Sequence, residues 1–307
     1  MSEELPKGVE TDFSLARLTT VRAGGTADFF AKPVSEKALV DLLAWARDRD
    51  AAVGIVGSGS NLLVADAGFR GLVLKLSGDL TRFERHGERV MAGGGARLPS
   101  LSAKAAGWGL TGIEFGVNIP GTVGGAVRMN ANAYGGELAK ALDWVSVCTA
   151  EGPERRAPDQ LGFAYRQSNL GAGEVVSRAG FALEQAGSVA EVKATMAAMR
   201  ERRLEAQPSG IKTFGSTFMN PDGPGVEGRS AGQLLDDADC RGLAVGGARF
   251  SIKHANFVEN TGDASTTDIL AVMSAGRRRV YDRFGVMLEP EVQVLGEVEW
   301  PADWELE

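Results

Sequence analysis

The spacing of apolar residues in the first third of the chain predicts one helix and three short strands. Ser35, behind a Pro-Val start, is the expected N-cap of the helix. Four apolar residues then share one helical face: Leu39, Leu42, Leu43 and Ala46. Residues 51–56, 62–64 and 72–76 are short apolar runs of strand character, separated by glycine-rich and polar turns.

Further along, the pattern alternates without a regular strand-helix repeat. Residues 107–136 hold nine glycines among apolar residues, which predicts an ordered, buried coil. Strands are expected at 144–149, 174–183 and 286–295, the last with an edge or bulge at Pro290. Helices are expected from Ser188 to Ala206, from Ser230 to Cys240 and from Ser265 to Phe284. Together these elements predict an α+β fold.

Composition allows a large folded protein and argues against nucleic-acid or membrane partners. The 307 residues are 44% hydrophobic and 24% charged, enough for two or three domains. With 33 basic and 40 acidic residues the net charge is −7, so no general attraction to nucleic acid or anionic lipid is expected. Residues 1–10 do not resemble a secretory signal and no run of about 18 apolar residues occurs, which predicts a cytoplasmic protein.

Cysteine and histidine are too sparse for a metal centre or a disulfide framework. Cys148 and Cys240 are far apart in sequence, no CxxC occurs, and the chain holds only two histidines. We therefore expect no metal.

The 41 glycines are roughly twice the usual share of ~7%, and three glycine-bearing stretches of the first half stand out. The stretches are residues 22–27, 57–61 and 119–126. The second, Gly-Ser-Gly-Ser-Asn after an apolar run, offers backbone N–H groups and hydroxyls to a pyrophosphate. A dinucleotide fingerprint fails because Leu62 stands where its third glycine belongs, and no lysine completes a P-loop. A plain hairpin turn is the alternative.

These stretches resemble the FAD-binding domain of vanillyl-alcohol-oxidase-type (PCMH-type) flavoproteins, and the wider pattern resembles the UDP-N-acetylenolpyruvoylglucosamine reductase (MurB) family. The shared motifs follow in the family's order from about residue 18 to 296. They are residues 112–116, 119–126, 129–131, 163–168, 215–221, 251–257 and 288–292. The chain lacks room for an extra tyrosine-bearing loop, so it is similar to the shorter, type II, members.

The resemblance implies a two-lobed FAD-binding domain at 18–187, with lobes at about 18–77 and 78–187, and a substrate-binding domain at 188–307. It implies FAD as cofactor, NADPH as co-substrate, UDP-N-acetylglucosamine enolpyruvate as substrate, and a monomer. The FAD is expected to be non-covalent, because His86 and Cys148 lie outside the glycine stretches. The expected cofactor-binding residues are Gly57, Ser58, Gly59, Ser60, Asn61, Ile119, Pro120, Gly121, Thr122, Gly124, Gly125 and Ala126.

The resemblance also assigns the catalytic residues. Ser216 is the expected proton donor, with Arg166 and Glu291 around the substrate carboxylate and the intermediate. Without the resemblance, Ser216 would be read as a turn residue and Arg166 as a surface cation, and Glu289 would share Glu291's strand parity. The expected substrate-binding residues are Tyr165, Asn220 and His254.

Two residues depart from the family pattern. Met219 stands where lysine is usual, and its loss of a cation bears on the contacts to substrate phosphate. Asn132 stands where glycine is usual, a change that asparagine tolerates well because it adopts left-handed backbone conformations. A flavin-dependent oxidase, which would not need Ser216, and a catalytically silent flavin- or nucleotide-binding regulator are the alternative functions.

The assignment of Ser216 leads to a first prediction. Replacing Ser216 by alanine should leave reduction of the flavin by NADPH intact and slow its reoxidation by the enolpyruvyl substrate by ~10² to 10⁴-fold, because the proton donor is lost. Stopped-flow flavin absorbance measures both steps. Unchanged reoxidation would remove Ser216 from this role.

Overall fold

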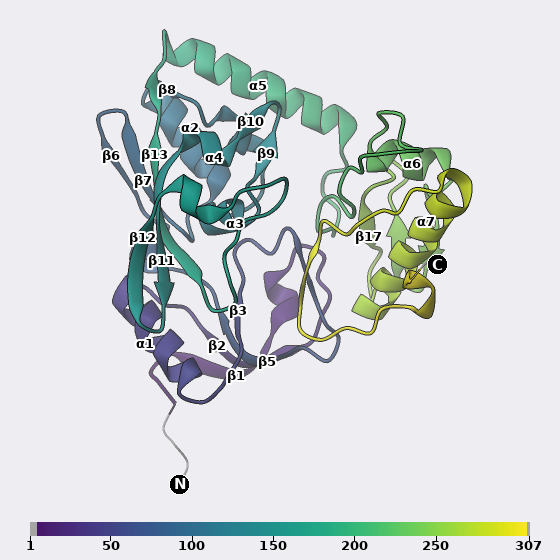
Figure 1. The fold of residues 1–307 in the computed structure, drawn as a ribbon, viewed down its shortest axis with the longest axis horizontal. Coiled ribbons are helices and arrows are strands. Elements are labelled where there is room, and N and C mark those ends of the chain that lie inside the picture. Colours follow the sequence, from purple (N-terminus) through teal and green to yellow (C-terminus); the bar gives the residue numbers. More distant parts are fainter. Residues whose placement is uncertain (1–4, 306–307) are drawn as a thin grey trace. The chain divides into compact units, whose positions relative to one another are not determined.

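The computed structural model describes residues 5–305, which form two compact units (Figure 1). Unit 1 comprises residues 5–12, 28–58 and 70–203, and unit 2 comprises residues 13–27, 59–69 and 204–305. Both are therefore discontinuous in sequence. The chain enters unit 2 for the last time at Leu204, near the end of a long helix, whereas the sequence-based division lies before that helix, at 187/188.

The first sheet of unit 1 has the order β1-β2-β5-β3, with β3 parallel to β5. Its strands are β1 (Val9–Ser14), β2 (Thr26–Ala31), β3 (Val53–Ile55) and β5 (Phe69–Leu74). The helix α1 (Glu36–Arg47) begins where predicted, because the Ser35 side chain accepts a hydrogen bond from the Ala38 N–H at 3.2 Å. Its four predicted core residues are all buried.

The second sheet of unit 1 is antiparallel, in the order β12-β11-β13-β7-β6. Its strands are β6 (Phe83–His86), β7 (Arg89–Gly93), β11 (Leu142–Thr149), β12 (Gly152–Arg156) and β13 (Val175–Ala182). Central β13 is buried over most of its length. Two small ribbons pair β8 (Leu110–Thr111) with β14 (Glu184–Gln185) and β9 (Asn132–Ala133) with β10 (Gly136–Glu137).

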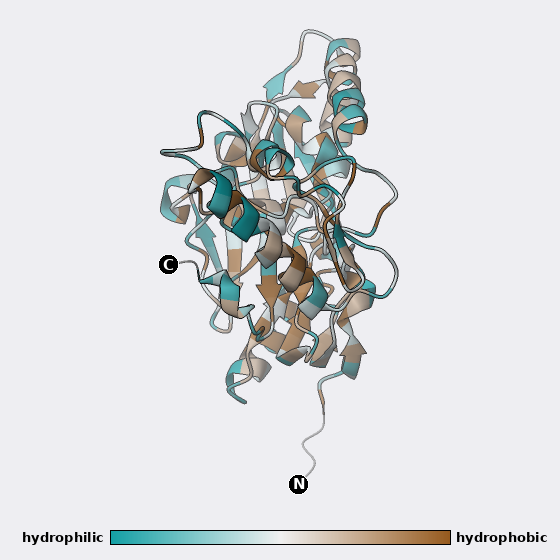
Figure 2. Cartoon of the chain, turned by 90° about the vertical axis from the view of Figure 1, so that its right-hand side faces the viewer, coloured by the Kyte–Doolittle hydropathy of each residue, from teal (hydrophilic) through white to brown (hydrophobic). Residues whose placement is uncertain are grey.

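Besides α1, the helices of unit 1 are α2 (Leu98–Gly107), α3 (Val123–Arg128), α4 (Leu138–Ala141), η2 (Gly78–Thr81), η3 (Glu114–Asn118), η4 (Pro158–Leu161) and most of α5 (Val189–Ala206). Of these, α3 packs on β13 and β7, η2 on β7, and η4 on β11. In Figure 2 the helices carry both hydrophilic and hydrophobic residues, as expected for elements packed on one face. None of the helices within residues 5–305 combines the length and apolar character needed to cross a membrane.

Unit 2 is built around the long helix α7. Its other elements are η1 (Leu15–Leu18), β4 (Leu62–Val64), α6 (Ala231–Asp237), β15 (Ala244–Val245), β16 (Ala248–Phe250), β17 (Val258–Asn260), β18 (Gln293–Leu295) and η5 (Ala302–Trp304). A capping box between Ser265 and Asp268 starts α7 (Thr266–Phe284), and Gly285 ends it with a φ of +66°. The buried face of α7 lies in one core with Phe214, Phe218 and Phe250.

The α+β class is confirmed, but two predicted elements were wrong in extent. Residues 107–136 are not coil throughout: they include η3 and α3, because Thr122 caps a helical turn by accepting a hydrogen bond from the Gly125 N–H at 3.4 Å. Residues 286–295 are not one strand. Only Gln293–Leu295 pair as a strand, parallel to β4, since Pro290 has no N–H to extend a ladder.

A glycine inside α7 gives a stability prediction. A Cβ at Gly276 would lie 2.5 Å from the ring of fully buried Phe250. Gly276→Ala should therefore lower the free energy of unfolding by roughly 1–2 kcal/mol, since overpacking outweighs the gain in helix propensity. Urea unfolding measures this. Gly107→Ala is the control, because a Cβ there meets no atom within 4 Å and should cost no stability.

Candidate active site

The predicted cofactor loop, Gly57 to Asn61, lies directly between two strands. It follows β3 and Val56, whose N–H donates to Leu74 O at 2.9 Å, and β4 begins immediately after it at Leu62. The rejection of a dinucleotide fingerprint is therefore confirmed, because that motif requires a helix here. Gly57 and Ser58 belong to unit 1, and Gly59 to Asn61 belong to unit 2.

The backbone of this loop is available to an anion. Within residues 5–305, no group accepts a hydrogen bond from the N–H groups of residues 57–61. Successive backbone N–H groups in a turn can form a concave site for an anion such as a diphosphate. The loop therefore fits the FAD pyrophosphate.

No side chain fits at two of the loop's glycines. A Cβ at Gly57 would lie 2.5 Å from Thr122 Oγ1 in unit 1, and a Cβ at Gly59 would collide with Leu18 O in unit 2. Gly59 also has a φ of +64°. The lack of space for a side chain at both positions and the left-handed backbone of Gly59 explain why the loop is rich in glycine. Gly57 also lies against Thr122, which belongs to the second predicted cofactor segment, residues 119–126.

A lysine that sequence reasoning missed supports the same loop. Lys75 Nζ donates a hydrogen bond to Gly57 O. Burial, together with the nearby Lys32 and Arg97 cations, lowers the pKa of Lys75. These cations give unit 1 a local positive charge near Gly57, despite the chain's net negative charge. The sequence signal that could have identified Lys75 is its position as a charged residue inside the apolar run at 72–76.

The second cofactor segment is held in place by the turn before α2. The backbones of Thr122 and Arg97 pair in an isolated antiparallel β-bridge. The Val123 N–H donates to Ala96 O at 2.8 Å, and the Gly124 N–H donates to Gly94 O at 2.7 Å. The N-terminal turn of α3 therefore positions Thr122 against Gly57 within unit 1. The third glycine stretch, residues 22–27, packs its glycines against residues 64–68 within unit 2.

Arg166 stands at the corner of a four-residue turn in unit 1. Ala164 and Gln167 exchange two backbone hydrogen bonds of 3.1 and 3.2 Å, and Arg166 has a φ of +58°. Its Nη1 donates to Asn132 O at 3.4 Å, and its guanidinium lies 5.1 Å from the ring centroid of exposed Tyr165. The turn holds Arg166 in a defined place beside the predicted substrate residue Tyr165.

Asn130 anchors this turn from a buried position. Its amide nitrogen donates to Ala164 O at 3.2 Å and to Glu137 Oε1 at 2.8 Å, and its oxygen accepts from the Ala139 N–H at 3.3 Å. The motif at residues 129–131 and the motif at 163–168 are therefore one structure. No role had been assigned to Asn130, because its partner is 34 residues away.

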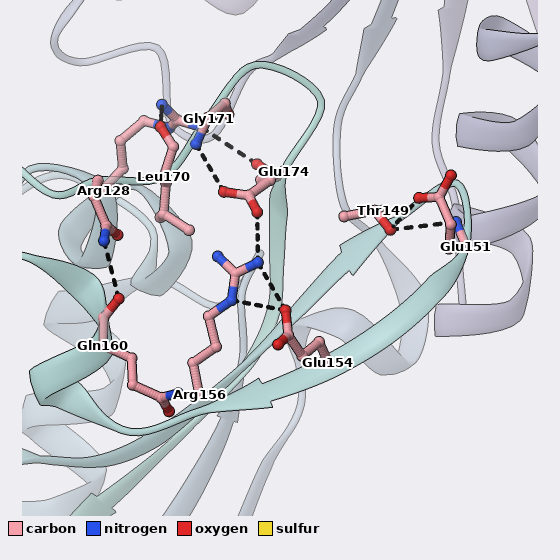
Figure 3. Close-up of polar contacts among 10 residues, drawn as sticks. Arg128, Thr149, Glu151, Glu154, Arg156, Gln160, Leu170, Gly171 and Glu174 are labelled. Atoms are coloured by element: carbon pink, nitrogen blue, oxygen red, sulfur yellow. Dashed lines mark hydrogen bonds and ion pairs between the residues drawn. The ribbon is translucent and has the colours of Figure 1, made fainter.

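Charged groups hold the far end of the same loop (Figure 3). Arg156 Nη2 donates to Glu174 Oε1 at 2.5 Å, and the Gly171 N–H donates to Glu174 Oε2 at 2.7 Å. The Arg156 hydrogen bond holds the pKa of Glu174 below its usual range, and burial lowers the pKa of Arg128, which donates to Gly171 O at 3.0 Å. The loop that carries Arg166 is thus fixed at both ends.

In unit 2, Ser216 and Glu291 lie on adjoining extended segments. Ser216 forms an antiparallel bridge with Phe257, and its neighbour Thr217 accepts a hydrogen bond from the Glu291 N–H at 2.9 Å. The amide nitrogen of Asn61, a predicted cofactor residue, donates to Glu291 O at 3.1 Å. Three predicted residues from distant motifs therefore meet within this unit.

The other two predicted residues of unit 2 flank α6. Asn220 Oδ1 accepts from the Ala231 N–H at 3.1 Å, at the start of the helix. His254 Nδ1 accepts from the Asn256 N–H at 3.2 Å, and burial followed by the Arg241 cation lowers the pKa of His254. The imidazole is therefore neutral at neutral pH, with its proton on Nε2.

Comparison with known proteins decides the family. Residues 207–295 match the model of the UDP-N-acetylenolpyruvoylglucosamine reductase C-terminal domain, and residues 27–157 match an FAD binding domain. A UDP-N-acetylenolpyruvoylglucosamine reductase of Anaeromyxobacter sp. (strain Fw109-5) is 44% identical over 93% of this chain and 88% of its own length. The chain belongs to the UDP-N-acetylenolpyruvoylglucosamine reductase family.

Other members of the family agree. UDP-N-acetylenolpyruvoylglucosamine reductase 2 of Symbiobacterium thermophilum is 41% identical over 93% of this chain and 92% of its own length. The crystal structure of the Thermus caldophilus reductase is similar, with a TM-score of 0.80 and 35% identity over 95% of this chain and 99% of that one. The predicted resemblance and the predicted FAD domain are both confirmed.

The structure clarifies the two departures from the reductase family pattern. Asn132 lies in β9 and does not have a left-handed φ; the left-handed residues nearby are Asn130 and Tyr134. The expected need for a tolerant residue at 132 therefore does not arise. The Met219 N–H donates to Glu289 O at 2.9 Å, a backbone contact that does not depend on the side chain at this position.

The close approach of Gly57 to Thr122 leads to a prediction for FAD affinity. Gly57→Ala should weaken FAD binding at least tenfold, because the new methyl group pushes the loop away from Thr122 at a cost of about 1–3 kcal/mol. Titration of the apoprotein with FAD, followed by flavin fluorescence, measures this.

A second substitution tests that cause. Adding Thr122→Ala to Gly57→Ala removes the two closest atoms and leaves only Cβ, at 3.4 Å, so part of the affinity should return. Because Thr122 also caps α3, Thr122→Ala alone is the reference: Gly57→Ala should cost less affinity in the Thr122→Ala background than in the wild-type background, and an equal cost in both would contradict the steric explanation.

Proposed function

We propose that the protein reduces UDP-N-acetylglucosamine enolpyruvate to UDP-N-acetylmuramate with NADPH, through non-covalently bound FAD, in peptidoglycan precursor synthesis. The observation that carries this proposal is the meeting of Ser216 and Glu291 within a domain of the reductase family. FAD binding at residues 18–187 and nucleotide-sugar binding at 188–307 are part of the proposal.

The reaction needs a hydride at the terminal carbon of the enolpyruvyl group and a proton at the carbon that bears the ether oxygen and the carboxylate. Bound FAD supplies the hydride after reduction by NADPH. The protein's own residues must then stabilise the developing enolate and deliver one proton.

Ser216 is the proposed proton donor. Its backbone is fixed by the bridge to Phe257, and the side chain is only half-buried, so its hydroxyl can meet a substrate atom. A serine hydroxyl is a weak acid, so it needs a developing negative charge to receive its proton. The Glu291 N–H donates to the carbonyl of Thr217, the residue after Ser216. Glu291 is therefore the proposed second group beside the substrate carboxylate and the intermediate.

Arg166 is the proposed ligand of the substrate carboxylate. A guanidinium binds a carboxylate with two parallel hydrogen bonds, and the left-handed turn and the Asn132 contact restrict where this one can point. Tyr165, Asn220 and His254 are the proposed contacts to the rest of the nucleotide sugar. For His254 the free group is the Nε2–H donor, which suits a phosphate or carboxylate oxygen.

The positions of His86 and Cys148 support non-covalent binding of FAD, since histidine and cysteine are the residue types that covalent flavin oxidases of this fold use. His86 is at the exposed end of β6, and Cys148 is completely buried in β11, where burial raises the pKa of the thiol. We further propose a cytoplasmic monomer without nucleic-acid or membrane partners. The net charge of −7 supports the absence of such partners.

An anaerobic experiment tests the proposed reaction. Bound FAD is first bleached with NADPH, and UDP-N-acetylglucosamine enolpyruvate is then added while flavin absorbance is followed. We expect stoichiometric recovery of the oxidised spectrum with formation of UDP-N-acetylmuramate. Absence of recovery contradicts the proposal; recovery only on admitting oxygen would indicate an oxidase, and no bleaching would indicate a silent binding protein.

A further inference from the structure

The stretch that carries Glu291 is irregular and depends on individual contacts. Residues 288–291 precede β18 and belong to no strand. Two backbone bonds of 2.9 Å attach them to the Ser216 segment: from the Met219 N–H to Glu289 O and from the Glu291 N–H to Thr217 O. Because Pro290 offers no N–H, a regular ladder cannot secure this stretch.

Asn61 supplies a further contact, directly at Glu291. Its amide nitrogen donates to Glu291 O at 3.1 Å, and its own carbonyl accepts from the Gln293 N–H at 3.2 Å. The next residue, Leu62, pairs with Gln293 in the parallel β4-β18 register. Asn61 therefore makes hydrogen bonds to the residues on both sides of Val292, Glu291 and Gln293. Its amide nitrogen is engaged with the protein, although the residue lies in the cofactor loop.

Arg277 supplies a second side-chain contact, from α7. Its Nε donates to Leu288 O at 2.8 Å, its Nη1 donates to Trp304 O, and its guanidinium lies 4.6 Å from the Trp304 ring centroid. The Arg277 side chain is only 7% exposed, and Nη2 lies 3.7 Å from Glu289 Oε1. A buried cation is costly unless its donors are satisfied, so this arrangement holds Leu288 firmly.

We propose that Asn61 and Arg277 are positioning residues for Glu291. Asn61 fixes the carbonyl of Glu291 itself, and Arg277 fixes the carbonyl of Leu288, so the irregular stretch is held at both ends. Asn61 also makes the cofactor loop continuous with the Glu291 segment. The inference rests on the proposed function, because it concerns the catalytic role of Glu291.

Half-reactions of the FAD-loaded protein test the inference. Asn61→Ala and Arg277→Lys should each slow reoxidation by the enolpyruvyl nucleotide by about 10- to 100-fold, since small misplacements of a catalytic group have effects of this size. Reduction by NADPH should be unchanged in Arg277→Lys, which lies outside the cofactor loop; Asn61→Ala is measured at saturating FAD and is judged by its reoxidation step alone. Arg278→Lys is the matched control: Arg278 is the next residue of α7, pairs with Asp282 at 2.8 Å on the surface, and should behave as wild type.

A double-mutant cycle separates positioning from general damage. If Asn61 acts through Glu291, adding Asn61→Ala to Glu291→Gln should slow reoxidation no further than Glu291→Gln alone. Fully multiplied effects, or a loss of FAD with unchanged reoxidation, would overturn the inference. If Arg277→Lys unfolds, the Asn61 cycle decides. Failure of wild-type protein to be reoxidised by the nucleotide would instead overturn the proposed function, before any variant is measured.

Discussion

Close approach of backbone to neighbouring atoms is the constraint on which the candidate site depends. Gly57 lies against Thr122 in unit 1, and Gly59 lies against Leu18 O in unit 2, with no space for a side chain at either position. A Cβ at Gly25 would likewise collide with Asp66 O. The contacts at Gly57 and Gly59 require glycine, and the N–H groups of the same loop, residues 57–61, have no acceptor within residues 5–305, which suits an anionic cofactor.

Local signals in the sequence predicted much of the fold. Caps act over three or four residues, so the starts of α1, α6 and α7 could be read from Ser35, Ser230 and Ser265. The α+β class followed from the same elements. The FAD domain and the family followed from motifs in a fixed order, whereas composition and spacing alone reached only an anion-binding loop.

Contacts between distant residues could not be predicted. Nothing near Asn130 indicates that its amide binds Ala164, and nothing near Asn61 indicates that it binds Glu291. Alternation could not choose between Glu289 and Glu291, because residues two positions apart lie on the same face of a strand. In the structure the Glu289 side chain is 60% exposed, whereas Glu291 is half-buried beside the Ser216 segment. Roles that depend on long-range packing require the structure.

The left-handed backbone of Arg166 affects which substitutions at this position would stabilise the protein. A φ of +58° costs a residue with a side chain roughly 1–2 kcal/mol, and glycine would avoid most of that cost. Selection for stability alone would favour glycine at the corner of this turn. With Arg166 as the proposed ligand of the substrate carboxylate, thermostability and turnover are expected to oppose each other at this position, so variants chosen only for heat resistance should lose the guanidinium first.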